Sequence, residues 1–168
     1  FLMIRRPPRS TLSSSSAASD VYKRQMEETP AEAIEKVELS EGSEHIVKML
    51  NSGEGGQMIF EPAVIKVSVG DTIHFKATDA AHNSVSVDGM LPAGAVSWAS
   101  QLSQDISVTL DTEGVYVYQC DPHLIMAMVG VIQVGEAVNM DEIRSAASSY
   151  SANFLMNNDR LQSYLNQL

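Results

Sequence analysis

The segment GVYVYQCDPHLIMAMVGVIQVG, residues 114–135, decides how this chain folds. Two runs rich in valine, isoleucine and tyrosine, residues 115–119 and 129–134, flank a short stretch that contains Pro122. Runs of this composition and length predict strands, and an Asp-Pro pair between them predicts a turn. We therefore expect two strands joined by a tight loop, with the chemically distinctive side chains in the loop.

That loop carries candidate metal ligands. Cys120, the only cysteine in the 168 residues, is followed by His123 and then by Met126 and Met128, and His82 lies upstream. One thiolate, two imidazoles and one thioether favour copper, because a His₂Cys plane with a weak axial methionine is typical of copper electron-transfer sites. Taken singly, a cysteine and two methionines are equally well explained as buried hydrophobes. Their spacing around a proline, where the backbone is expected to turn, favours the metal site.

Further strands are expected upstream of this segment. Short runs rich in Val, Ile and Phe, separated by Gly, Asp, Asn and Pro, occupy residues 45–50, 57–62, 64–70, 72–77 and 106–110. Together with the two strands around the loop, they predict an all-β sandwich of seven to eight strands. His82 follows the run at 72–77, so its loop can lie at the same end of the sandwich as the Cys120 loop.

After Gly135 the apolar period changes from that of a strand to that of a helix. Asn139 followed by Glu142 predicts a capping box at a helix start. Two amphipathic helices are expected, packed across the open end or a face of the sandwich. Their apolar positions are Ile143, Ala146, Ala147 and Tyr150 in the first helix and Phe154, Leu161, Leu165 and Leu168 in the second.

The N-terminal part is predicted to lie outside the fold. Residues 1–25 are basic and serine-rich, lack the apolar core of a signal peptide, and resemble a translated sequencing adapter, so we expect a disordered, non-native segment. Residues 26–44, with seven acidic side chains, are expected to form an acidic flexible leader. The folded domain is then 45–168, with a sandwich at 45–135 and a helical hairpin at 139–168.

The charge of the chain limits its partners. Residues 26–168 contain six basic and twenty acidic residues, a formal charge of −14. This balance argues against nucleic acid, which requires a basic patch, and favours a cationic protein partner. No apolar run reaches the ~18 residues that predict a membrane span, and we expect a monomer.

The stretch from about residue 44 to 168 resembles the pseudoazurins, a family of small cupredoxins with two C-terminal helices. The resemblance lies in residues 49–75, 82–95 and 114–135. It implies a Greek-key sandwich, one type 1 (blue) copper ion, and a small soluble electron-transfer protein of the bacterial periplasm, although no signal peptide is present in this frame. The implied ligands are His82, Cys120, His123 and, as the axial thioether, Met128, since the flanking Met-Val-Gly-Val matches the family. Asn83 matches its asparagine that joins the two ligand loops.

The chain departs from the family in the charge around its site. Pseudoazurins surround their exposed ligand histidine with lysines, whereas here the neighbours are Ala81, Gln119 and Asp121. The family's usual partner, a copper nitrite reductase, is therefore in doubt, and the expected redox partner is a cationic cytochrome or a copper reductase. An apolar collar is expected around the site, although loop packing explains the same residues equally well: Met90, Leu91, Pro92, Pro122, Leu124 and Ile125.

Three functional classes fit a copper site. Electron transfer needs one closed mononuclear site, which this chain supplies. A multicopper oxidase would need histidines beside Cys120, where Gln119 and Asp121 stand, and a dinuclear copper site would need a second cysteine. We therefore predict no enzymatic activity. Copper delivery or storage is the alternative, although Met126, Met128 and Met140 are few for an ion-exchanging cluster.

Overall fold

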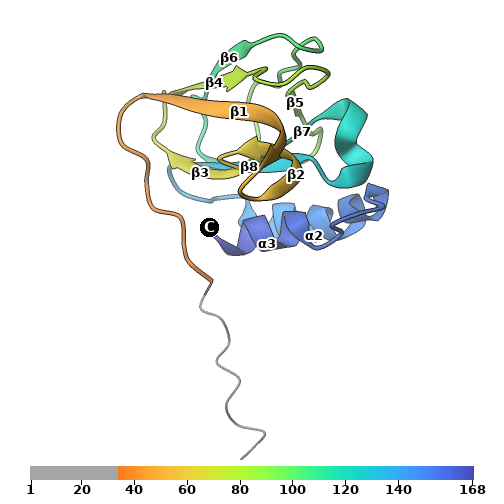
Figure 1. Ribbon diagram of the computed structural model, residues 1–168. Helices are drawn as coiled ribbons and strands as arrows, with labels where there is room; N and C mark the ends of the chain where they lie inside the picture. Colours follow the sequence, from red (N-terminus) through yellow and green to blue (C-terminus); the bar gives the residue numbers. More distant parts are fainter. Residues whose placement is uncertain (1–33) are drawn as a thin grey trace, which may run out of the picture. The chain divides into compact units, whose positions relative to one another are not determined.

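Two four-stranded sheets face each other in the computed structural model, which describes residues 34–168 (Figure 1). The predicted non-native segment 1–25 and residues 26–33 of the predicted leader lie outside the described residues. The first sheet has the order β2-β1-β4-β6 and the second β3-β8-β7-β5. The strands are β1 (Glu44–Gly53), β2 (Gly56–Glu61), β3 (Val64–Val67), β4 (Thr72–Lys76), β5 (Val85–Ser86), β6 (Ile106–Thr109), β7 (Gly114–Gln119) and β8 (Val129–Val134).

The connections confirm the predicted Greek-key sandwich. The chain passes from one sheet to the other at each step from β2 to β7, and only β1–β2 and β7–β8 are consecutive partners in one sheet. Two neighbouring pairs, β1 with β4 and β3 with β8, are parallel. Every predicted run forms a strand, and the two-residue β5 is the one that the apolar pattern did not reveal.

A core of apolar and aromatic side chains fills the space between the sheets. Strand β1 alternates as predicted, with Val47 and Met49 fully buried and Ile46 exposed. Four aromatic rings stack or meet edge to face, with the Phe60–Tyr118 centroids 4.7 Å apart and the Phe75–Tyr118 centroids 5.0 Å apart. This packing anchors the end of β7, two residues before Cys120, in the core between the sheets.

The helices α2 (Met140–Tyr150) and α3 (Arg160–Asn166) cover the outer face of the second sheet, under β7 and β8 (Figure 1). A 3₁₀ turn, η2 (Ser151–Asn153), follows α2. A second core joins the two layers, so β7 and β8 are buried on both faces and read as almost continuous apolar runs. Its members include Val115, Val117, Val129, Val131, Ile143, Ala147, Leu161 and Leu165.

Part of the predicted leader is hydrogen-bonded to the folded domain. The Val37 N–H donates to the Gln167 carbonyl over 2.9 Å, and the Ser40 N–H donates to the Lys66 carbonyl over 2.8 Å. Leu39 forms an isolated parallel bridge with Lys66 of β3. Residues 37–40 therefore extend the edge of the second sheet, and the rest of the predicted division of the chain stays a prediction.

Asn139 occupies the N-cap of α2, but the predicted capping box is wrong. Its side chain makes no capping bond. Instead Oδ1 accepts from the Val115 N–H at 2.6 Å and Nδ2 donates to the Val115 carbonyl at 3.0 Å. Strand β5 is too short to reach this part of β7, so the Asn139 amide takes the place of a neighbouring strand.

A pair of substitutions at Asn139 distinguishes these two roles. Asn139→Ala leaves both Val115 backbone groups without a partner and should cost about 1–3 kcal/mol of unfolding free energy. Asn139→Asp should also destabilise the protein, because the aspartate side chain has no donor for the Val115 carbonyl. Aspartate is as good an N-cap as asparagine, so a capping role alone predicts no loss of stability. Urea denaturation measures both variants. A wild-type stability for Asn139→Asp would restore the capping role.

Candidate metal centre

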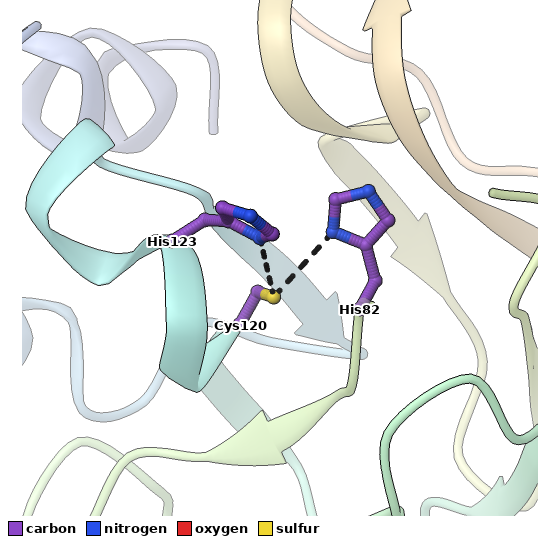
Figure 2. Close-up of side chains that lie close together, drawn as sticks. All are labelled: His82, Cys120 and His123. Carbon is purple, nitrogen blue, oxygen red and sulfur yellow. Dashed lines mark hydrogen bonds between the residues drawn. The ribbon is translucent and has the colours of Figure 1, made fainter. Parts of the chain in front are cut away.

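The structure brings together three of the predicted ligands at one end of the sandwich (Figure 2). His82 lies in the loop between β4 and β5, Cys120 directly follows β7, and His123 lies in the 3₁₀ helix η1 (Asp121–Met126). The Cys120 Sγ is 3.6 Å from His82 Nδ1 and 3.4 Å from His123 Nδ1. All three donor atoms lie within 4.8 Å of one another, so a single ion can contact all of them.

The predicted axial residue lies at the other end of the ligand loop. Met128 is fully buried directly before β8, and its carbonyl accepts the Cys120 N–H at 2.9 Å. This backbone bond closes the loop at its base. Met126, the other candidate, is half-buried in the last turn of η1.

The orientation of His82 is fixed by a residue that sequence reasoning missed. The fully buried ring donates from Nε2 to the Asn51 Oδ1 at 2.9 Å. With its proton on Nε2, the ring turns the lone pair of Nδ1 toward Cys120, which is the arrangement that metal-bound histidines commonly show. Asn51 lies near the end of β1, where the sequence indicated only a turn.

The environment keeps His82 neutral. Burial is the largest influence and lowers the pKa of the ring, the nearby His123 lowers the pKa further, and Asp79 opposes both effects. A neutral imidazole is the form that binds a metal ion. The electrostatics of the site therefore keep the Nδ1 lone pair available.

The Cys120 thiol is held in the protonated form in the absence of a metal ion. Burial raises its pKa most, and the Asp121 charge adds to this, while the backbone N–H groups of Asn83 and His123 oppose it. Because the thiolate is the metal ligand, binding of an ion must release this proton. Metal binding is accordingly coupled to pH.

Asn83 joins the two ligand loops, as the family resemblance implied. Its Oδ1 accepts the Asp121 N–H at 2.8 Å, and its Nδ2 donates to the Asp121 Oδ2 at 2.9 Å. Asp121 also accepts from the Gln119 Nε2 at 2.6 Å. The residues next to His82 and Cys120 are thus bonded to each other by two hydrogen bonds.

The surface around the site corrects the predicted collar. Met90 is only 2% exposed and Pro92 is buried, so neither contributes to an exposed surface. Pro122 is exposed, Leu91 and Leu124 are half-buried, and Ile125 is 53% exposed. Leu155 and Met156, 77% and 52% exposed, extend this surface, because both of their N–H groups donate to the Ile125 carbonyl.

Comparisons with known proteins agree with this geometry. The model of the copper-binding proteins of the plastocyanin/azurin family matches residues 47–135. The chain is 42% identical to a pseudoazurin of Paracoccus pantotrophus over 103 residues, 61% of this chain and 71% of that protein. It is 43% identical to a pseudoazurin of Methylorubrum extorquens over 102 residues, 61% of this chain and 68% of that protein.

Solved structures show the same relationship. The crystal structure of pseudoazurin from Hyphomicrobium denitrificans superposes with a TM-score of 0.67 at 37% identity, over 74% of this chain and 98% of that one. A pseudoazurin from Sinorhizobium superposes with a TM-score of 0.61 at 38% identity, over 72% of this chain and 98% of that one. The buried Cys120, the two histidines that face it and the helix-backed sandwich that holds them therefore place the chain in the plastocyanin/azurin family of copper-binding proteins, among the pseudoazurins.

Proposed function

We propose that this chain is a small type 1 copper electron carrier in which His82, Cys120, His123 and Met128 hold one copper ion. The observation that carries the proposal is the position of the buried Cys120 Sγ. It lies 3.6 Å from the His82 Nδ1 and 3.4 Å from the His123 Nδ1. This donor set fits copper in both oxidation states. When bound, the ion supplies the uptake and release of a single electron.

The surroundings of the ligands suit that task. His82, Cys120 and Met128 are fully buried, and the Asn83–Asp121 pair and the Asn51 bond hold their loops and rings. Ligands that are held by the sheets and their hydrogen bonds move little when the charge of an ion changes. Burial of these ligands also opposes exchange of the ion, which favours a carrier over copper delivery or storage.

Met128 is proposed as the axial ligand in preference to Met126. Met128 is buried within the same core as Cys120, whereas Met126 is half-buried at the surface end of η1. The carbonyl of Met128 is already bonded to the Cys120 N–H. That bond keeps the two residues adjacent whichever way the rest of the loop moves.

Electrons are proposed to pass through the edge of His123. It is half-buried, while the other three proposed ligands are fully buried. The apolar surface formed by Pro122, Ile125, Leu155 and Met156 flanks its helix. A small apolar contact of this kind is suited to brief docking of a redox partner.

The partner is proposed to be a cationic cytochrome or a copper reductase, and the carrier to act as a monomer. The −14 formal charge of residues 26–168 and the exposed Asp121 beside the site support a cationic surface on the partner. No helix in residues 34–168 has both the length and the apolar character needed to cross a membrane. A periplasmic location is proposed on the family resemblance alone.

The carrier is proposed to have no catalytic activity of its own. Within residues 34–168 the cluster of His82, Cys120 and His123 is the one group of histidine, cysteine and acidic side chains spaced to hold a metal ion. The single cysteine of the chain belongs to it. Chemistry that needs a second metal centre therefore has no ligands in this part of the chain.

Copper loading tests the site directly. The Cu(II) form should be intensely coloured because the Cys120 thiolate donates charge to the ion, and Cys120→Ser should lose the visible band completely. Absorption spectroscopy of both proteins decides the matter. A colourless Cu(II) complex of the wild-type chain would favour delivery or storage, and a coloured Cys120→Ser variant would contradict the ligand assignment.

The axial assignment is tested by two methionine substitutions. Met128→Leu should raise the reduction potential because it removes a weak donor to copper, whereas Met126→Leu should leave the potential nearly unchanged. Protein-film voltammetry of the two variants beside the wild type measures the difference. The reverse ranking would give the axial role to Met126.

The charge of the partner is tested by the salt dependence of electron transfer. With a basic cytochrome the bimolecular rate should fall steeply as salt rises, because the Debye length shortens to about 8 Å at ~0.15 M. Stopped-flow measurements with a basic and an acidic cytochrome provide the comparison. A faster reaction of the acidic cytochrome at low salt would contradict the proposed charge complementarity.

A further inference from the structure

Three successive carbonyl groups lie directly before Met128: those of Ile125 and Met126, the last two residues of η1, and that of the C-cap residue Ala127. Of the three, the Ala127 carbonyl already accepts the Val129 N–H at 3.0 Å. The ends of helices leave carbonyl groups without intrahelical partners. The backbone of Ala127, which follows η1, adopts the left-handed conformation with a φ of 57°. The chain therefore turns sharply here before β8.

The segment that joins α2 to α3 supplies donors to the Ile125 and Met126 carbonyls. The N–H groups of Leu155 and Met156 donate to the Ile125 carbonyl at 2.8 and 3.1 Å. The Asn157 Nδ2 donates to the Met126 carbonyl at 3.2 Å. The C-terminal hairpin thus bonds directly to the ligand loop, in addition to covering the sheet.

Arg160, the first residue of α3, extends these contacts across the molecule. Its Nη1 lies 3.3 Å from the Met126 carbonyl and 3.1 Å from the Ala127 carbonyl. The same nitrogen lies 3.1 Å from the Met58 carbonyl and 3.4 Å from the Gln57 carbonyl of β2, and Nη2 also reaches Gln57 at 3.4 Å. One guanidinium therefore bridges the end of the ligand loop and a strand of the first sheet.

A guanidinium is suited to this position. It presents several N–H donors in a planar arrangement and stays charged, and hydrogen bonds from a charged donor are stronger than neutral ones. Within residues 34–168 Arg160 makes no ion pair. Its donors are directed at backbone carbonyls, so the contacts indicate that Arg160 holds the two backbone segments in position.

We propose that Arg160 is a positioning residue for the copper site, which fixes the Met126–Ala127 carbonyls and through them the thioether of Met128. The inference rests on the proposed axial role of Met128. Because the axial ligand tunes the potential of such sites, the α2–α3 hairpin then helps to set the reduction potential. In this proposal the α2–α3 hairpin acts on the metal centre through the position of Met128.

Three variants separate positioning from charge and from general stability. Arg160→Lys keeps the positive charge but loses the planar set of donors, and Arg160→Met removes both. Arg144→Met is the matched control, because Arg144 joins the hairpin to itself through the Asn166 Oδ1 at 2.9 Å and the Leu165 carbonyl at 3.1 Å. If Arg160→Met fails to fold, Asn157→Ala removes a neighbouring donor to the same Met126 carbonyl.

The first measurement uses the metal-free protein. The amides of Ala127 and Met128 donate to the Leu124 and His123 carbonyls, and hydrogen exchange followed by NMR reports how often the loop opens. Both Arg160 variants should exchange these two amides about tenfold faster than the wild type, because both lose the planar set of donors that bridges the carbonyls before Met128 to β2. Arg144→Met should leave them unchanged. This readout does not depend on copper.

The second measurement uses the Cu(II) form. Both Arg160 variants should change the relative intensities of the thiolate-to-copper bands and shift the reduction potential, and Arg144→Met should do neither. If Arg160→Lys matches the wild type in exchange and spectrum, only charge matters and the proposal is wrong. If Arg144→Met loosens the loop equally, the effect is general stability and the proposal is also wrong. A colourless wild-type protein would contradict the copper function while leaving the exchange test valid.

Discussion

The paired hydrogen bonds between Asn83 and Asp121 are the interaction on which the site depends. His82 and Cys120 are far apart in sequence and sit in loops from different strands, so nothing in either loop alone brings the imidazole to the thiol. The bonded pair stands directly beside both ligands and makes one rigid unit of the two loops. Within this unit His82 is fully buried, and its ring is oriented by the single Asn51 amide.

The sequence predicts well the strands of this protein and the loop that brings Cys120 and His123 together, because both have local signatures. Alternating apolar residues defined β1 and the continuous apolar runs defined β7 and β8, and the Cys-x₂-His-x₄-Met spacing singled out the loop. Asn51, Asn139 and Arg160 escaped prediction for a common physical reason. Each acts through bonds between segments that are distant in sequence, and a polar side chain near the end of a strand or a helix has no period that reveals its distant partner.

Asn139 illustrates the limit most clearly. Its spacing to Glu142 fits a capping box, and the helix does begin there, but the amide bonds to Val115 instead. An unpaired stretch of β7 offered a donor and an acceptor together, and an amide satisfies both, whereas a helix start offers donors only. Tertiary context therefore overrode a correct local pattern. The predicted apolar collar was wrong in the same way at Met90 and Pro92, because both residues are buried.

The burial of Cys120 has a consequence for the protein before it acquires its ion. A fully buried thiol whose pKa is raised stays protonated, and a protonated, inaccessible thiol reacts slowly with disulfides, peroxides and alkylating agents. The buried position that suits a metal ligand therefore also limits the access of oxidants and alkylating agents to the single cysteine of the chain.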